Sequence, residues 1–169
     1  MPLDGDRREA VVSATQKTIA RAAVVSGVEL APLPVRFDLA GRSAGQFSAR
    51  GSSCLIRYNP WIFQRYFAEN LSTTVAHEVA HYAVYRAFPG RQVKPHGREW
   101  KAVMRALGAD PAVTFDLDIS GLPVRRQRRH VYHCGCKEHA LSTTRHKRVV
   151  SGRARYACLE CRRELRFIG

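Results

Sequence analysis

One ten-residue stretch, residues 73–82, constrains this chain more than any other part of it. It is TTVAHEVAHY, so His77 and His81 stand four residues apart and Glu78 follows the first of them. On an α-helix, residues four apart lie on the same face, which lets the two imidazoles reach one metal ion together. Glu78 is then placed to act as a general base on a water molecule at that metal. The pattern is typical of zinc peptidases and predicts a zinc-dependent hydrolytic centre.

The helix that carries this stretch is expected to be buried. We expect a cap at Asn70 or Ser72 and an end near Phe88, where Pro89 and Gly90 break the helix. Its other positions are almost all apolar, namely Val75, Ala76, Val79, Ala80, Ala83 and Val84. A helix that is apolar nearly all round is a buried one. Two imidazoles and a carboxylate are costly in such surroundings without a partner, and a metal ion supplies that partner.

A third metal ligand has to come from outside the motif helix. Catalytic zinc takes three protein ligands and leaves one position open. Residues 82–95 contain no His, Asp or Glu, so the next candidates are His96 and Glu99. We favour His96, because the break before it lets the chain turn back and a second helix is expected at residues 97–107. Glu99 is the alternative ligand, or a hydrogen-bond partner for a ligand imidazole.

The sequence around the motif predicts the rest of an α+β domain over residues 1–120. Apolar residues recur at helical spacing over residues 6–26, and Gly27 ends that helix. Three alternating stretches then predict a three-stranded antiparallel meander, at residues 35–39, 44–50 and 53–58. A short helix is expected at residues 61–68. The domain would thus contain an N-terminal helix, the meander, the active-site helix and a second ligand helix.

Four of the five cysteines lie close together near the end of the chain, in two pairs. The chain begins without the apolar core of a signal peptide, so this pattern favours metal binding over disulfides. Cys158 and Cys161 form a Cys-x-x-Cys knuckle, whereas the first half offers three candidates for two places: Cys134, Cys136 and His139. Two such knuckles predict a zinc ribbon over residues 132–169. A ribbon this small depends on its metal for folding, so this second zinc would be structural.

Basic residues are concentrated in the same region. The chain has a formal net charge of +14, and residues 121–169 contain thirteen Lys and Arg against three Asp and Glu. This excess predicts a polyanionic partner, DNA, without deciding between single and double strands. A basic linker is expected at residues 121–131. The candidate contact residues are Arg125, Arg126, Arg128, Arg129, Arg145, Lys147, Arg148, Arg153 and Arg155.

Together these motifs resemble the SprT family of zinc metalloproteases, which is related to the Spartan DNA–protein crosslink protease. The resemblance is carried by IRYNP at residues 56–60, HEVAH at 77–81, PHGREW at 95–100 and the basic ribbon after them. It extends over nearly the whole chain. It implies a minimal zincin-like catalytic domain with His77, His81 and His96 as zinc ligands and Glu78 as the general base. It also implies activity near DNA.

The predicted function is that of a zinc metalloendopeptidase acting on proteins, in particular DNA-associated proteins or DNA–protein crosslinks. The residue that stabilises the oxyanion stays open among Tyr82, Tyr85 and Arg98. The main alternative is a DNA-binding zinc protein with a non-catalytic zincin-like site, which would leave Glu78 without a role. A zinc hydrolase acting on a small molecule ranks last, because no nucleotide-cofactor or small-ligand motif is present.

Hydropathy and the first residues lead to an expectation about location. No run of about 18 apolar residues is present, so no membrane span is expected. With no signal-peptide pattern, we expect a cytoplasmic protein, with the nucleoid as the site of a DNA-associated function.

Overall fold

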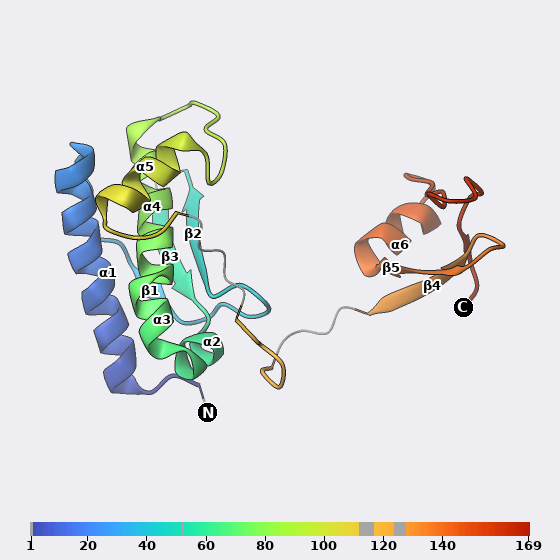
Figure 1. The fold of residues 1–169 in the computed structure, drawn as a ribbon, viewed down its shortest axis with the longest axis horizontal. Helices are drawn as coiled ribbons and strands as arrows, with labels where there is room; N and C mark the ends of the chain where they lie inside the picture. Colours follow the sequence, from blue (N-terminus) through green and yellow to red (C-terminus); the bar gives the residue numbers. More distant parts are fainter. Residues whose placement is uncertain (1, 52, 112–116, 124–127) are drawn as a thin grey trace. The chain divides into compact units, whose positions relative to one another are not determined.

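The computed structural model describes residues 2–51, 53–111, 117–123 and 128–169, and its chain forms two compact units (Figure 1). The first unit is Met1–Val124 and the second is Arg125–Gly169. Within the described residues, no helix is long and apolar enough to cross a membrane. Both units contain helices and a small sheet, which confirms the mixed α+β class; the likeness to zincins in particular stays a prediction.

The first unit contains five helices and three strands among its described residues. The helices are α1 (Gly5–Ser26), α2 (Pro60–Arg65), α3 (Phe67–Ser72), α4 (Thr74–Ala87) and α5 (Arg98–Ala106). The strands are β1 (Val35–Arg36), β2 (Gly45–Arg50) and β3 (Ser53–Tyr58). α1 starts at Asp4, whose carboxylate accepts a hydrogen bond from the Arg7 amide, and ends at Gly27 with φ of 66°. The single short helix expected at residues 61–68 is instead the pair α2 and α3.

The expected antiparallel meander is wrong at its first strand. The sheet order is β1-β3-β2, with β2 antiparallel to β3 but β1 parallel to it. Val35 is the partner of Ile56; Ile56 belongs to the hydrophobic core and Val35 packs against that core. Alternation of apolar and polar residues decides which face of a strand is covered, but it does not decide which neighbour the strand pairs with. β2 therefore lies at one edge of the sheet rather than at its centre.

α4 is the central element of the first unit, as the sequence predicted. It packs against α1, α5 and β2, and Figure 1 shows it between α1 and the sheet. Its buried residues are Thr74, Val75, Ala76, Glu78, Val79, Ala80, Tyr82 and Ala83. The core around it includes Val11 and Ile19 of α1, Ile56 and Tyr58 of β3, and Met104 of α5. The motif helix is thus held on three sides, and its two imidazoles are only half-buried.

The second unit is built on a sheet of order β5-β4-β6. Its elements are β4 (Arg129–His133), β5 (Glu138–Ser142), α6 (Thr143–Val150) and β6 (Arg166–Phe167). The sequence between the two cysteine pairs, from His139 to Arg155, predicts a hairpin with its turn at Ser151 and Gly152, and this prediction is wrong because α6 occupies the middle of that stretch. Ser142 caps this helix by accepting a hydrogen bond from the Arg145 amide. β4 begins inside the stretch that was expected to be a linker.

Candidate metal centre and active site

Three imidazoles converge at the first unit's candidate metal centre. His77 and His81 project from adjacent turns of α4, and His96 comes from the loop before α5. The Nε2 atom of His96 lies 2.9 Å from that of His77 and 3.1 Å from that of His81. Ligand nitrogens on a tetrahedral zinc are roughly 3.3 Å apart. The three nitrogens are therefore close to the spacing that one zinc ion requires, while Glu99 lies outside this group of three.

The surroundings keep two of these imidazoles neutral. Burial lowers the pKa of His77 to about 4, helped by the nearby His81 and His96. Burial and the nearby His96 lower the pKa of His81 to about 4 as well. Only a neutral imidazole has a free nitrogen lone pair for a metal ion. At neutral pH both residues are therefore in the form that binds zinc.

A tight turn brings His96 to the other two histidines. The Gly97 amide donates a 2.8 Å hydrogen bond to the Lys94 carbonyl, with Pro95 and His96 between them. His96 has φ of 55°, and among the described residues only one other non-glycine residue, Arg162, has a positive φ. Such a backbone is strained for a residue with a side chain and is typical of functional sites. Gly97 is required as well, since a Cβ there would lie 2.7 Å from the Lys94 oxygen.

Trp100 supports all three histidines, a role that sequence reasoning missed. Its ring centroid lies 4.7 Å from that of His77, 5.7 Å from that of His81 and 4.7 Å from that of His96. Its indole nitrogen donates a 3.3 Å hydrogen bond to the His77 carbonyl. The sequence indicated only that Trp100 belongs to the apolar face of its helix. Its contact with the ligands depends on how α5 packs on α4.

Glu78 lies against the edge strand of the sheet. Its side chain is buried, and its Oε2 atom accepts a 2.6 Å hydrogen bond from the Phe47 amide. Burial raises the pKa of Glu78 to about 7, and the Phe47 hydrogen bond opposes this rise. A carboxylate with a pKa near the working pH is well suited to both accept and return a proton. The residue thus has the environment expected of a general base.

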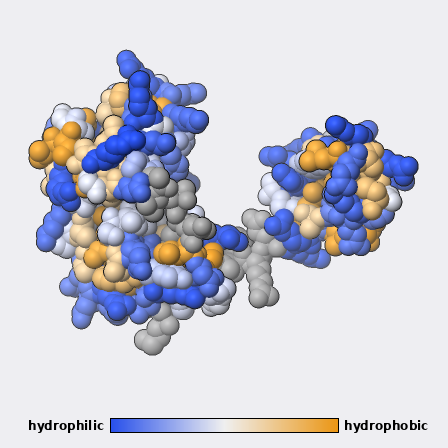
Figure 2. Space-filling model, in the orientation of Figure 1, coloured by the Kyte–Doolittle hydropathy of each residue, from blue (hydrophilic) through white to orange (hydrophobic). Residues whose placement is uncertain are grey.

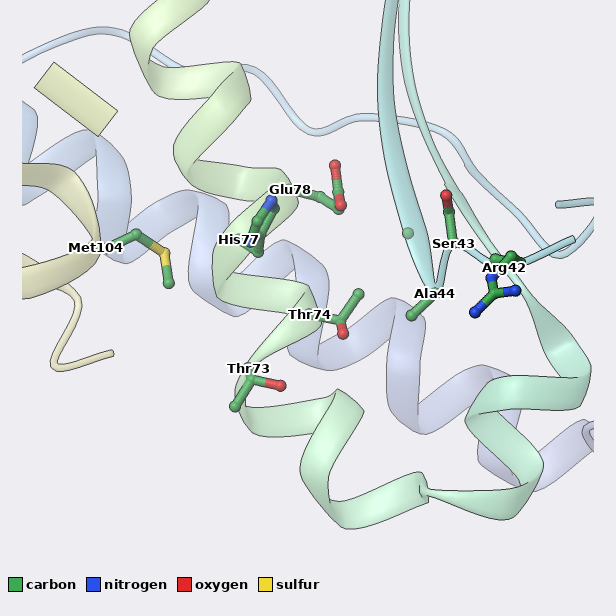
Figure 3. A pocket seen from close by; sticks show the side chains of 9 residues that line it. Arg42, Ser43, Ala44, Thr73, Thr74, His77, Glu78 and Met104 are labelled. Carbon is green, nitrogen blue, oxygen red and sulfur yellow. The ribbon is translucent and has the colours of Figure 1, made fainter. Parts of the chain in front are cut away.

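Two hollows adjoin this group of residues. The first, of about 270 Å³, is lined by His77 and Glu78 and by a mixture of polar and non-polar neighbours: Arg42, Ser43, Ala44, Gly45, Thr73, Thr74 and Met104 (Figure 3). In Figure 3, the Glu78 side chain extends from α4 toward the segment that carries Ser43 and Ala44. The second hollow, of about 420 Å³, is lined by His81 and His96. Each of the two hollows therefore shares at least one histidine with the candidate metal centre.

None of the three candidates for stabilising the oxyanion is singled out by its position. The hydroxyl of Tyr82 donates to the Ala31 carbonyl at 3.2 Å, and its side chain is buried. Tyr85 lines the second hollow, and its hydroxyl donates to the Gly51 carbonyl at 3.4 Å. Arg98 pairs with Glu99 at 3.4 Å, and its side chain is 93% exposed. Tyr82 is thereby committed to the core rather than to the metal centre.

Comparison with known proteins identifies the family. The model of the SprT-like family matches residues 16–128. The chain belongs to the SprT-like family. It is 37% identical to Protein SprT of Pasteurella multocida over 132 residues, which are 78% of this chain and 76% of that protein. It is 33% identical to Protein SprT of Vibrio parahaemolyticus over 140 residues, which are 82% of this chain and 81% of that protein. No solved structure matches the chain.

In this SprT-like chain, the four clustered cysteines form a second candidate metal centre. The sulfur atoms of Cys134, Cys136, Cys158 and Cys161 all lie within 4.8 Å of one another. Cys134 and Cys136 are 3.1 Å apart, and Cys136 and Cys158 are 3.8 Å apart. Sulfur atoms on a tetrahedral zinc are roughly 3.8 Å apart. His139 lies beside this group, with its Nε2 atom 3.3 Å from the Cys134 sulfur.

The candidate nucleic-acid residues are divided by the structure. Arg125 and Arg126 lie outside the described residues. Four others line a hollow of about 830 Å³ in the second unit, namely Arg128, Lys147, Arg148 and Arg153. Of the remaining three, Arg129 begins β4, Arg145 packs over the Tyr156 ring at 5.6 Å and Arg155 pairs with Glu164 at 3.7 Å. Hydrophilic residues cover much of this unit's visible surface (Figure 2).

Two histidines that sequence reasoning missed line the same basic hollow. His130 and His146 are stacked with ring centroids 3.7 Å apart and an angle of 4° between the planes. The hydroxyl of Tyr132 contacts the Nδ1 atom of His146 at 3.0 Å. A charge run in the sequence indicated the cations, but nothing in it indicated that β4 and α6 would bring these imidazoles together. The hollow is therefore both basic and aromatic.

Proposed function

We propose that this chain is a zinc-dependent endopeptidase that hydrolyses peptide bonds in protein substrates. The observation that carries the proposal is the convergence of three imidazole nitrogens next to a buried carboxylate, Glu78, at a site that two hollows adjoin. His77, His81 and His96 would hold the metal. A zinc ion bound there would supply a Lewis acid that polarises the scissile carbonyl and lowers the pKa of a water molecule to about 7.

The chain's own residues would do the proton transfer. Glu78 would accept a proton from the attacking water and deliver it to the leaving amine. Its 2.6 Å hydrogen bond from the Phe47 amide fixes one carboxylate oxygen and leaves the other for this exchange. Trp100 would keep the three imidazoles aimed at one point. A purely structural metal site would need no buried carboxylate beside it, which is why we favour catalysis.

We further propose that the second unit directs this activity to DNA and carries a structural zinc. Its cysteine group offers four thiolates at zinc spacing, and its hollow gathers four cations. Phosphate contacts by such cations weaken as salt displaces them. The substrates would then be DNA-associated proteins or DNA–protein crosslinks. The alternative, a DNA-binding zinc protein without activity, is favoured only by this second unit.

The decisive experiment is cleavage of a protein crosslinked to DNA by the zinc-loaded full chain. Glu78→Gln should keep the zinc content and lose cleavage by at least about 100-fold, as expected for loss of a general base. If Glu78→Gln cleaves as fast as the parent, the proposed mechanism is wrong. If the parent binds zinc and DNA but cleaves nothing, the non-catalytic alternative stands.

DNA contact is tested separately by the salt dependence of binding. The slope of log affinity against log salt should be about −0.9 for each phosphate contact to duplex DNA and about −0.7 to single strands. Replacing Arg128, Lys147, Arg148 and Arg153 by alanine should make the slope shallower, whereas Lys101→Ala in the first unit should not. Binding that does not depend on salt would contradict the proposal.

A further inference from the structure

We propose that the hollow beside His81 and His96 is a specificity pocket for one bulky apolar side chain, best an aromatic one, of the peptide being cleaved. The proposal rests on the peptidase function proposed above and adds to it the chemical class of residue that the enzyme selects. The pocket is defined by the twelve residues that line the second hollow: Phe47, His81, Val84, Tyr85, Phe88, Gly90, Arg91, Val93, Lys94, Pro95, His96 and Trp100.

The position of this pocket ties it to the scissile bond. Two of its lining residues, His81 and His96, belong to the candidate metal centre. Its wall includes Phe47, whose backbone amide donates to the Glu78 carboxylate at 2.6 Å. The same residue therefore fixes both the general base and one side of the pocket. A side chain seated there would belong to a residue next to the bond that is cut.

The two hollows differ in the residues that line them. The smaller hollow, of about 270 Å³, is lined by Arg42, Ser43, Thr73 and Thr74 among others. The pocket, of about 420 Å³, is lined mainly by aliphatic and aromatic side chains. Its volume lies within the range of about 300–1,000 Å³ that is usual for ligand sites. Burial of apolar surface therefore favours an apolar side chain in this pocket.

An aromatic side chain in the pocket would extend a row of aromatic rings. The Phe47 ring lies 5.6 Å from the Tyr82 ring and 5.6 Å from the Tyr85 ring, tilted in both cases. Tyr82 is buried, whereas Tyr85 at the end of the row is 43% exposed. Tilted and edge-on contacts at this distance are the arrangement that aromatic pairs prefer. Tyr85 is thus a partly exposed aromatic residue in the lining of the pocket, available to contact an incoming side chain.

Two cationic side chains that line the pocket also influence which substrate side chain binds there. Arg91 and Lys94 are exposed on the loop between α4 and α5, and both line the pocket. A lysine or arginine side chain of the substrate would be repelled there by like charge. An acidic residue next to the apolar one would be attracted instead. The occupant is therefore an apolar side chain in a neutral or acidic context.

The test uses the zinc-loaded full chain and a peptide series in which one residue is varied among Phe, Leu, Ala and Lys. Cleavage positions are read by mass spectrometry, and kcat/KM is measured for each peptide. We expect cleavage next to the varied residue, with Phe exceeding Ala on the order of 100-fold and Lys below Ala. Equal kcat/KM across the series would overturn the pocket and leave the peptidase function in place.

Variants of the pocket provide an internal comparison. Tyr85→Ala should reduce the ratio of Phe to Ala peptides about tenfold, since one aromatic contact is lost. In Val93→Trp, the larger side chain should occupy the hollow, so kcat/KM should become higher for the Ala peptide than for the Phe peptide. Val24 is exposed on α1 and lines neither hollow, so Val24→Ala should leave kcat/KM unchanged for both the Phe peptide and the Ala peptide. A ratio that is unaffected by both pocket substitutions contradicts the proposal.

Peptide binding to the inactive variant Glu78→Gln separates the proposal of a specificity pocket from the proposal of peptidase function. Zinc-loaded Glu78→Gln should bind the Phe peptide about tenfold more tightly than the Ala peptide, measured by calorimetry. If this preference is found but the parent chain cleaves nothing, the peptidase function fails and the pocket stands. If both peptides bind equally, the pocket is wrong whether or not the parent cleaves.

Discussion

Gly45 and Glu78 are in direct contact, because β2 passes so close to α4 that residue 45 has no room for a side chain. A Cβ on Gly45 would lie 2.7 Å from Cγ and 2.8 Å from Oε1 of Glu78, and 2.8 Å from Cγ2 of Thr74. Two residues along the same strand, Phe47 donates its amide to the same carboxylate. The edge strand therefore both confines and orients the candidate general base.

Substituting Gly45 should damage stability and activity together. Gly45→Ala forces Glu78 or the strand to move, and such overpacking costs typically about 1–3 kcal/mol. Urea unfolding measures the loss of stability, and peptide cleavage should fall more than unfolding alone explains. Gly5→Ala is the matched control, since a Cβ there meets nothing within 4 Å. A Gly45→Ala chain that is as stable and active as the parent would contradict the close contact.

Substituting Gly97 should weaken metal binding at the histidine site. Gly97→Ala places a Cβ 2.7 Å from the Lys94 oxygen and so opens the turn that aims His96. Losing the support of a metal ligand typically costs about 10–100-fold in affinity. Zinc affinity is measured by competition with a chelator, with Lys101→Ala as the control on an exposed position of α5. Unchanged affinity in Gly97→Ala would show that the turn does not position the ligand.

Trp100 should report metal binding directly. Its ring lies within 6 Å of all three imidazoles, so zinc added to the metal-free protein should change its fluorescence. The chain has two tryptophans. Trp61→Phe should keep the zinc-dependent change, and Trp100→Phe should abolish it. Persistence of the signal in Trp100→Phe would mean that the metal binds elsewhere.

The cysteine group should hold the second unit together. Its apolar core is small, consisting of Tyr132, Cys134, Leu141, Cys158 and Leu165. Metal binding by such a module supplies much of its folding free energy. Cys158→Ala should therefore lower the zinc content from two to about one per chain and expose residues 125–169 to proteolysis, while residues 1–124 resist.

The same measurement decides the role of His139. Because four sulfurs already satisfy one zinc ion, His139→Ala should leave the zinc content unchanged. Loss of one zinc in His139→Ala, with retention in Cys134→Ala or Cys136→Ala, would place His139 among the ligands instead.

Local patterns were enough to predict much of this molecule. Three of the sequence signals are local, each set by residues close together in the chain. They are the spacing of His77 and His81, the apolar residues of the helix that carries them, and the break at Gly90. The predictions for α1, for α5 and for the end of α4 were accordingly correct to within about two residues, whereas the cap of α4 predicted at Asn70 or Ser72 is wrong, because the helix begins after Thr73. The cysteine spacing likewise indicated a metal-binding module, since knuckle geometry depends on neighbours in the chain.

Predictions that needed a choice between distant partners were less successful. β1 pairs in parallel with β3, which places Val35 beside Ile56 at the core. The stretch after β5 forms α6, a helix capped by Ser142, where the sequence had predicted a hairpin. In both cases the local sequence permits two structures, and packing against the rest of the unit selects one.

The sequence by itself determined that two histidines and a glutamate share a buried helix, and that four cysteines gather near the end of the chain. Only the tertiary structure decided that His96, and not Glu99, lies beside the other two histidines. It also decided that β2 packs against Glu78 and that an apolar pocket adjoins the metal centre. The physical reason is the range of the interactions. Helical periodicity acts over four residues, whereas the contact between Phe47 and Glu78 exists only after the sheet has packed on α4.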